Sequence, residues 1–169
     1  MVLFGNMICY KKLFPQEKEL IALVDYSNDV IKDSLIVLKA FGQQLHGVRV
    51  DTSKNMIDHM FDNEKNRDQY KGVCVEQIKR LRKALDENGG KHVKIIVSSG
   101  FTPEKIAHFE ASKAPVDAYG VGDYILKINH QSITLKIVLI TIFKTLMIFL
   151  KMKILKECSN GKKFFIINY

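Results

Sequence analysis

Four short strand-like segments, each followed by polar residues or glycines, constrain the fold of this chain more than any other feature. The segments are 20–24, 47–51, 92–97 and 115–119. The first run, 20–24, is continuously apolar and suits a strand buried on both faces, and the alternation of all four with helical stretches predicts a parallel sheet. We therefore expect an α/β fold whose chemistry lies at the carboxyl edge of the strands.

Helical periodicity follows each predicted strand. Apolar residues at helical spacing predict helices over about 30–41 and 73–85. Thr102 is suited to cap a third helix, and Pro103 to begin its first turn. Two weaker signals predict a short helix over 52–60 and a last helix that begins near Tyr124.

Composition divides the chain into three regions: an irregular N-terminal remnant at 1–16, the α/β part at 17–128, and an apolar, lysine-rich tail at 129–169. The tail has seven lysines and one glutamate, so it supplies +6 of the formal net charge of +8. The α/β part is therefore close to neutral and shows no basic face studded with aromatic residues, which argues against nucleic-acid binding.

The tail segment 133–155 is apolar but carries lysines at positions 136, 144, 151 and 153. Its lysine-free runs are shorter than the roughly 20 residues of a membrane span, and Lys144 near mid-bilayer would cost about 2.5–3.5 kcal/mol. These features argue against membrane attachment. Ile, Lys, Phe, Leu, Asn and Tyr are encoded by A- and T-only codons, so we favour out-of-frame translation of AT-rich DNA.

The three cysteines, Cys9, Cys74 and Cys158, do not form a C-x-x-C motif, and their number is odd. This usage fits free thiols in a reducing compartment, so we expect a cytoplasmic protein. The five histidines show no spacing typical of a metal site.

Two glycine-containing loops are the sharpest candidates for a binding site. Ser98, Ser99 and Gly100 follow the third strand, and Gly120 and Gly122 follow the fourth. Glycines allow close approach of the backbone to a ligand, and free N–H groups at a helix start bind anions. Because barrels commonly bind phosphate after their last two strands, the pair predicts a phosphate site. The alternative is two tight turns without a ligand.

Charged residues on the first two strands are the second candidate. Arg49 and Asp51 alternate with apolar residues, so both point to the same face, where they are costly unless satisfied. Arg49 is suited to bind a carboxylate, and Asp51 to bind ribose hydroxyls or Mg²⁺. The alternative is a mutual ion pair. Asp25 ends the first strand and is a candidate for the same hydroxyls or metal, or for a helix N-cap.

Taken together, these segments resemble the C-terminal half of nicotinate phosphoribosyltransferase in order and spacing. The resemblance covers about residues 15–128. It is carried by Ile21–Asp25, Gly47–Ser53, Val93–Phe101 and Val116–Gly122.

The resemblance implies part of an irregular (β/α) barrel of the type II phosphoribosyltransferase kind. The reaction it implies joins nicotinate and phosphoribosyl pyrophosphate to give nicotinate mononucleotide and pyrophosphate, with Mg²⁺ and with ATP as co-substrate. Arg49 would face the nicotinate carboxylate, and the catalytic residues Asp25 and Asp51 would position ribose hydroxyls and the metal. The 5′-phosphate would lie against Gly100, Gly120 and Gly122.

The sequence also departs from the family. The N-terminal half and the histidine that the family phosphorylates have no counterpart here, and Asp123 stands where a small hydroxyl residue is usual. A carboxylate there would repel a phosphate. We therefore expect an encoded fragment that is inactive alone. The alternatives are half of a split enzyme completed by an N-terminal chain, a homodimer, a non-catalytic membrane-attached protein, or another phosphate-binding barrel such as the related quinolinate enzyme.

Overall fold

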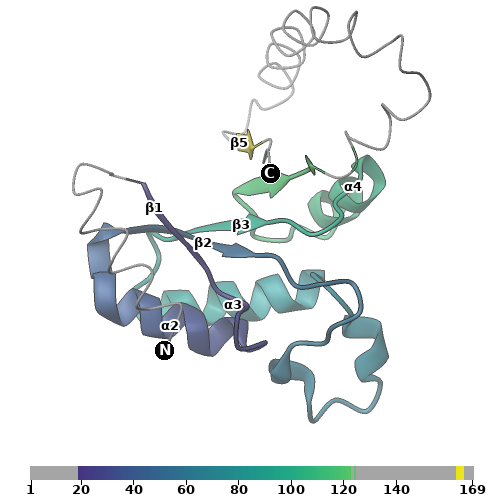
Figure 1. Cartoon of the computed structure of the whole chain (residues 1–169), viewed down its shortest axis with the longest axis horizontal. Coiled ribbons are helices and arrows are strands. Elements are labelled where there is room, and N and C mark those ends of the chain that lie inside the picture. The colour runs from purple at the N-terminus through teal and green to yellow at the C-terminus, as the bar shows by residue number, and fades with distance from the viewer. Residues whose placement is uncertain (1–18, 123, 125–162, 166–169) are drawn as a thin grey trace, which may run out of the picture.

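The computed structural model describes residues 19–122, 124 and 163–165, and its centre is a parallel sheet (Figure 1). The strand order is β1-β2-β3-β4-β5, and each neighbouring pair is parallel. The strands are β1 (Leu20–Leu23), β2 (Leu45–Val50), β3 (Lys94–Val97), β4 (Ala118–Gly120) and β5 (Lys163–Phe165). The predicted α/β class and parallel sheet are confirmed. No strand was expected where β5 lies.

Three α-helices connect the strands: α2 (Val30–Phe41), α3 (Val75–Glu87) and α4 (Pro103–Ala111). The helix predicted over 30–41 is confirmed at both ends, and α3 begins two residues later than predicted. Thr102 caps α4 as expected, because its hydroxyl accepts a hydrogen bond from the Lys105 N–H at 3.3 Å. The predictions for 1–16, for the segment 133–155, and for nearly all of the helix from Tyr124 fall outside the described residues.

The short helix predicted over 52–60 is wrong. This part of the chain is irregular, and only short 3₁₀ turns form in the connection between β2 and α3. Ile57 pairs with Lys71 in an antiparallel bridge, and Asp58 has an extended backbone. The bridge to Lys71 uses backbone groups that a helix would have used. The 3₁₀ segments are η1 (Gly42–Gln44), η2 (His59–Phe61) and η3 (Arg67–Tyr70).

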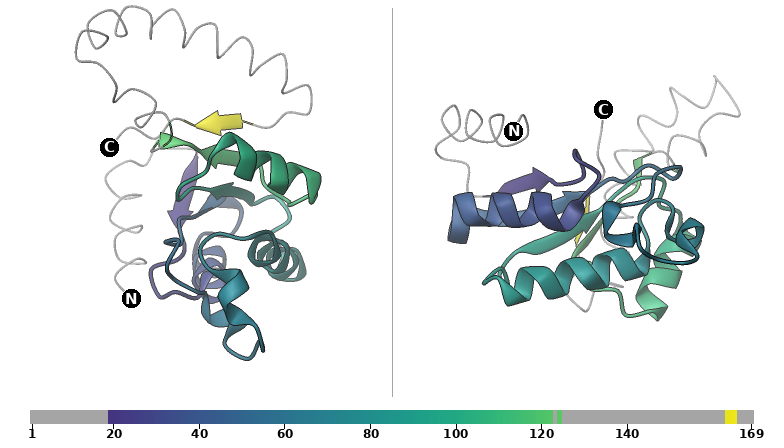
Figure 2. Two further views of the ribbon diagram at one scale, coloured as in Figure 1. Left: turned by 90° about the vertical axis from the view of Figure 1, so that its right-hand side faces the viewer. Right: turned by 90° about the horizontal axis from the view of Figure 1, so that it is seen from below.

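The helices pack on one face of the sheet, where the core lies. Strand residues that are paired in register share a face, as Val48 and Ile95 do, and then Val50 and Val97. All four are fully buried. Figures 1 and 2 show α2 and α3 side by side beneath this face. The helix residues that join the core cluster include Val30, Val37, Leu38, Ile78, Leu81 and Leu85.

The opposite face of β1 is open. Ile21 and Leu23 are 38% and 39% exposed, whereas Leu20 and Ala22 beside them are buried. The expectation that this strand is buried on both faces is therefore wrong. The physical reason is that β1 is the first strand in the sheet order and that the described helices cover the other face.

An aromatic cluster joins α4 to β4. The Phe101 ring lies 5.0 Å from Phe109 and 5.4 Å from Tyr119, measured between ring centroids. The Tyr119 hydroxyl donates a hydrogen bond to the Glu110 carboxylate at 2.6 Å, and burial raises the pKa of Tyr119 far above its ordinary value. The Lys105 ammonium lies 4.3 Å from the Phe101 ring centroid. These contacts fix the loop between β3 and α4.

A buried carboxylate helps to hold the long connection between β2 and α3 to the start of α2, where Asn28 also bonds to Ile57 and His59. Asp58 is 1% exposed and accepts hydrogen bonds from the Val30 and Met60 N–H groups, both at 2.9 Å. The Gln77 amide also donates to it at 3.4 Å. A residue in the connection therefore satisfies the first N–H of a helix that precedes it by 28 positions.

Replacing Asp58 with Ala should lower the free energy of unfolding by about 2–3 kcal/mol, because two backbone N–H groups lose their acceptor inside the protein. Urea denaturation followed by circular dichroism measures the change. Asp62→Ala is the matched control: Asp62 is 43% exposed in its ion pair with Arg67, so its loss should change stability by less than about 0.5 kcal/mol. Equal effects of the two substitutions would contradict this account.

Candidate functional site

Four predicted site residues meet at the carboxyl edge of the sheet. Asp25 follows β1, Arg49 and Asp51 stand at the end of β2, and Ser98 follows β3. The backbone N–H of Asp51 donates to Asp25 Oδ2 at 3.0 Å, and Arg49 Nε donates to Ser98 Oγ at 3.2 Å. Residues from three neighbouring strands are thus joined by hydrogen bonds. We call Asp25, Arg49, Asp51 and Ser98 the edge cluster.

Arg49 and Asp51 form an ion pair on one face of the sheet. Arg49 Nη2 lies 2.6 Å from Asp51 Oδ2, and the two side chains are 25% and 24% exposed. They point the same way, as alternation along the strand predicts. The mutual ion pair considered for them is present, and partial exposure leaves the pair within reach of a ligand from solvent.

Asp25 does not cap the helix that follows it. The N-cap of α2 is Asp29, whose carboxylate accepts a hydrogen bond from the Lys32 N–H at 3.1 Å. The N-cap role considered for Asp25 is therefore wrong. Its carboxylate instead reaches across to the backbone of Asp51 on β2.

The electrostatic setting of Asp25 disfavours its charged form. Burial raises the pKa of Asp25 above its ordinary value of 3.8, and the nearby charge of Asp51 raises it further. The hydrogen bond from the Asp51 N–H and the charge of Arg49 oppose this shift without cancelling it. Asp25 and Asp51 are thus two carboxylates close enough to repel, which is an arrangement that a cation would stabilise.

The loop after β3 turns sharply into α4. Ser99 and Gly100 both have left-handed backbones, with φ of 77° and 65°. Ser98 is buried, and its N–H donates to the Val50 carbonyl at 2.9 Å. A Cβ atom at Gly100 would meet no atom within 4 Å, so the space beside this glycine is open. The turn therefore presents accessible backbone next to the edge cluster.

The second glycine loop lies on the neighbouring strand. Val97 pairs with Tyr119, which places Gly120 beside the end of β3 and close to Ser98 in the sheet. On its other side Gly120 pairs with Phe165 of β5. Gly122 is partly buried. Asp123, whose carboxylate was expected to repel a phosphate, lies outside the described residues. The two loops that were predicted to share a ligand therefore follow adjacent strands of the sheet.

Two residues behind the site were not predicted. Thr52 follows Asp51 and is buried, and its hydroxyl oxygen lies 3.3 Å from the Gln77 side-chain amide of α3. Gln77 is itself fully buried. A glutamine on the apolar side of the predicted helix was the available sequence signal. This contact fixes the backbone that carries Asp51.

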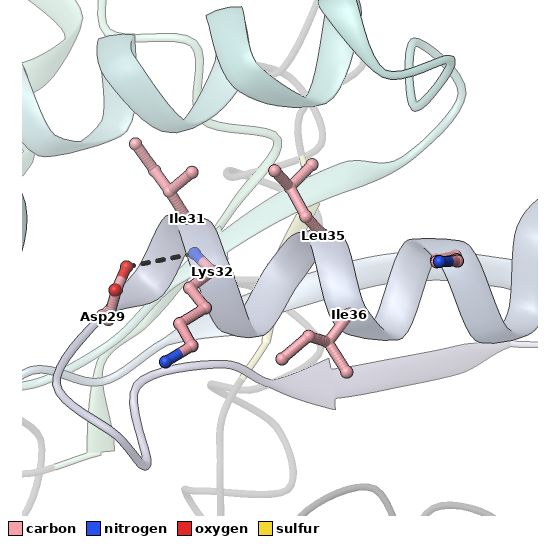
Figure 3. Close-up of a pocket in the computed structure, with 6 residues that line it drawn as sticks. Asp29, Ile31, Lys32, Leu35 and Ile36 are labelled. Atoms are coloured by element: carbon pink, nitrogen blue, oxygen red, sulfur yellow. Dashed lines mark hydrogen bonds between the residues drawn. The ribbon is translucent and has the colours of Figure 1, made fainter.

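A second surface feature lies away from the edge. Figure 3 shows a pocket along α2, which is lined by the apolar side chains of Ile31, Leu35 and Ile36 together with Asp29, Lys32 and Lys39. This pocket shares no residue with the edge cluster. Within the described part of the chain there is no group of three or more metal-ligating side chains, and no helix there is long and apolar enough to cross a membrane.

Comparisons with known proteins give a likeness among solved structures alone. No family model matches the sequence, and no curated protein matches it. Among solved structures, the chain is similar to nicotinate-nucleotide pyrophosphorylase from Pyrococcus furiosus, with 32% identity and a TM-score of 0.46. The match covers 62% of this chain and 22% of that protein.

Replacing Asp25 with Asn should leave the protein as stable as the wild type, or more stable, at neutral pH. The amide oxygen can still accept from the Asp51 N–H, while the free-energy cost of a partly buried charge disappears. Because the folded pKa of Asp25 is raised, its ionisation weakens the native state as pH rises from 3.8 through the folded pKa. Thermal unfolding across this pH range should therefore show a smaller loss of stability for the variant. A variant less stable than wild type at neutral pH would contradict this expectation.

Proposed function

We propose that the carboxyl edge is the substrate site of a phosphoribosyltransferase of NAD biosynthesis, within part of a (β/α) barrel. The proposed parent reaction transfers the phosphoribosyl group of phosphoribosyl pyrophosphate to nicotinate, giving nicotinate mononucleotide and pyrophosphate. The observation that carries the proposal is the chain of contacts from Asp25 through Asp51 and Arg49 to Ser98, beside the left-handed Ser99–Gly100 turn.

Each part of the cluster fits one part of these substrates. The Arg49 guanidinium suits the ring carboxylate, since its fork of donors matches a carboxylate in geometry and charge. The turn at Ser99 and Gly100, with Gly120 on the next strand, suits the 5′-phosphate. Anchoring the phosphate would fix the sugar without entering the chemistry.

The two carboxylates suit the reacting centre. In the transfer, the bond from ribose C1′ to the pyrophosphate oxygen breaks and a bond from C1′ to the pyridine nitrogen forms, so positive charge develops on the sugar. Asp25 and Asp51 would stabilise that charge and position the ribose hydroxyls.

The same pair fits a role in holding Mg²⁺, because hard cations of this kind are held by one or two carboxylates together with substrate phosphates and water. When bound, Mg²⁺ would stabilise charge on the leaving pyrophosphate. ATP is proposed as co-substrate on the sequence resemblance alone.

The ring carboxylate separates nicotinate from quinolinate, the substrate considered as an alternative. Among the described residues of the edge cluster, the cationic side chain is Arg49. One guanidinium matches the single carboxylate of nicotinate, whereas quinolinate carries two. Competition between the two acids for the isolated chain distinguishes them, and a preference for quinolinate would replace nicotinate in the proposal.

Isothermal titration of the chain with nicotinate mononucleotide tests the site, and two glycine variants locate it. Gly89 and Gly100 both have positive φ, and both have open space where a Cβ atom would lie. Replacing either glycine with alanine should therefore lower the free energy of unfolding by a similar amount, about 1–2 kcal/mol, through backbone strain. Only Gly100→Ala should weaken nucleotide binding, by about tenfold, because its methyl group would fill the space proposed for the phosphate. Gly89 follows α3 at the opposite edge of the sheet and serves as the control.

Absence of binding by the wild-type chain, even at high nucleotide concentration, would overturn the proposed site. Equal weakening by Gly89→Ala and Gly100→Ala would also count against it, since the effect would then arise from general destabilisation.

A further inference from the structure

The open face of β1 leaves two large apolar side chains in contact with solvent. Ile21 and Leu23 are 38% and 39% exposed, while the described helices pack on the other face of the strand. β1 is also the first strand in the sheet order, so within the described residues its outer edge has no partner strand. Soluble proteins usually cover an edge strand that carries apolar side chains, because such a strand is prone to association.

The backbone groups of the same two residues point to the uncovered edge. The Val24 N–H donates to the Arg49 carbonyl at 3.1 Å, so the backbone of Val24 is turned toward β2. Backbone groups alternate in direction along a strand, and those of Ile21 and Leu23 therefore point away from β2. Each of these residues thus presents both an apolar side chain and peptide groups to whatever lies beside β1.

A stretch of the chain that precedes β1 has the composition to cover it. Residues 1–10, which lie outside the described residues, include eight apolar residues and no charged side chain. A stretch of this composition gains free energy when it leaves water, so it is suited to an apolar surface. The charged residues before β1 gather in the next stretch, 11–18, which joins residues 1–10 to the strand.

The length of this join allows residues 1–10 to reach the whole of β1. Residues 11–18 end at Glu19, which directly precedes the strand. Eight residues extend over at most about 26 Å, whereas a strand of four residues such as β1 spans about 13 Å. The chain can therefore turn back and place residues 1–10 alongside β1 as far as Leu23.

Charge distinguishes this surface from the apolar pocket along α2 (Figure 3). Lys32 and Lys39 line that pocket with one acid, Asp29, so its rim is net positive. Three of the four charged residues in 11–18 are lysines, and docking beside α2 would bring like charges together. The open face of β1 has Glu19 at one end and the two carboxylates and one guanidinium of the edge cluster at the other. Charge therefore favours β1.

We propose that residues 1–10 of this chain dock on the open face of β1, where they cover Ile21 and Leu23 and pair with the outer edge of the strand. Because Leu23 pairs with Arg49 in register, the docked segment lies beside the edge cluster and forms a wall of the candidate site on that side. The inference depends on the exposed strand and on the composition of the segment. It does not depend on the proposed function, and its test requires no ligand.

Limited proteolysis of the full chain with chymotrypsin tests the docking, because cleavage after Phe4 and Tyr10 requires the segment to leave its surface. Leu23→Asp should speed this cleavage about tenfold, since a carboxylate placed in the apolar contact raises the population of the open form. Ile36→Asp is the matched control: Ile36 is 46% exposed and lines the pocket along α2, so this change should leave the rate unaltered. Thermal unfolding verifies that both variants are folded.

Two outcomes of the proteolysis would overturn the docking. Faster cleavage in Ile36→Asp alone would place the segment on the pocket along α2. Equal cleavage rates in the wild type and in both folded variants would show that neither surface holds residues 1–10.

A spin label on Cys9 gives a second readout, in a chain whose β1 is unaltered. In a variant whose other two cysteines are replaced with serine, the label should broaden the methyl NMR signals of Ile21 and Leu23 and leave that of Ile106 on α4 sharp. Sharp signals from Ile21 and Leu23 would overturn the proposal. Mixing isotope-labelled chain with unlabelled, spin-labelled chain identifies the occupant: broadening in the mixture would assign the face to a second copy and overturn docking within one chain.

Discussion

The hydrogen bond from the Asp51 backbone to the Asp25 carboxylate, at 3.0 Å, joins the first two strands at the edge where the candidate site lies. It sets the position of Asp51, and through Asp51 that of Arg49, whose guanidinium in turn reaches Ser98 at the end of β3. A partly buried carboxylate of this kind costs free energy, as the raised pKa of Asp25 indicates. A protein selected for stability alone would gain from an uncharged residue here. The arrangement is therefore typical of a site in which stability is given up for chemistry.

The rest of the fold makes this edge rigid. Val48, Val50, Ile95 and Val97 are fully buried against the helices, so the strand ends that carry Arg49 and Ser98 are fixed by packing. Phe101, Phe109 and Tyr119 fix the chain on the far side of the Ser99–Gly100 turn in the same way. Lys105, although it belongs to the first turn of α4, lies over the Phe101 ring, and burial lowers its pKa. Within the described part of the chain, Arg49 is the cationic side chain that contacts Asp51 and Ser98 at this edge.

Much of this arrangement could be predicted from the sequence because it depends on local patterns. A continuous apolar run identifies β1, and alternation along β2 places Arg49 and Asp51 on one face whatever the rest of the fold does. The contacts that could not be predicted join residues far apart in the sequence. The bond from Arg49 to Ser98 depends on the register of β2 against β3, and the irregular chain near Ile57 depends on its pairing with Lys71. The open face of β1 depends on which elements cover the sheet, which hydrophobicity does not reveal.

The buried carboxylate of Asp58 has a consequence for how the protein opens. Its bond to the Val30 N–H makes the start of α2 and the connection before α3 a single cooperative unit, although they are far apart along the chain. When the connection detaches, the first turn of α2 loses its acceptor, and the Val30 amide becomes available to solvent. Exchange of that amide with deuterium therefore reports on the connection rather than on fraying of α2 alone. Because the same connection continues directly from Asp51, its opening also loosens the edge that carries the candidate site.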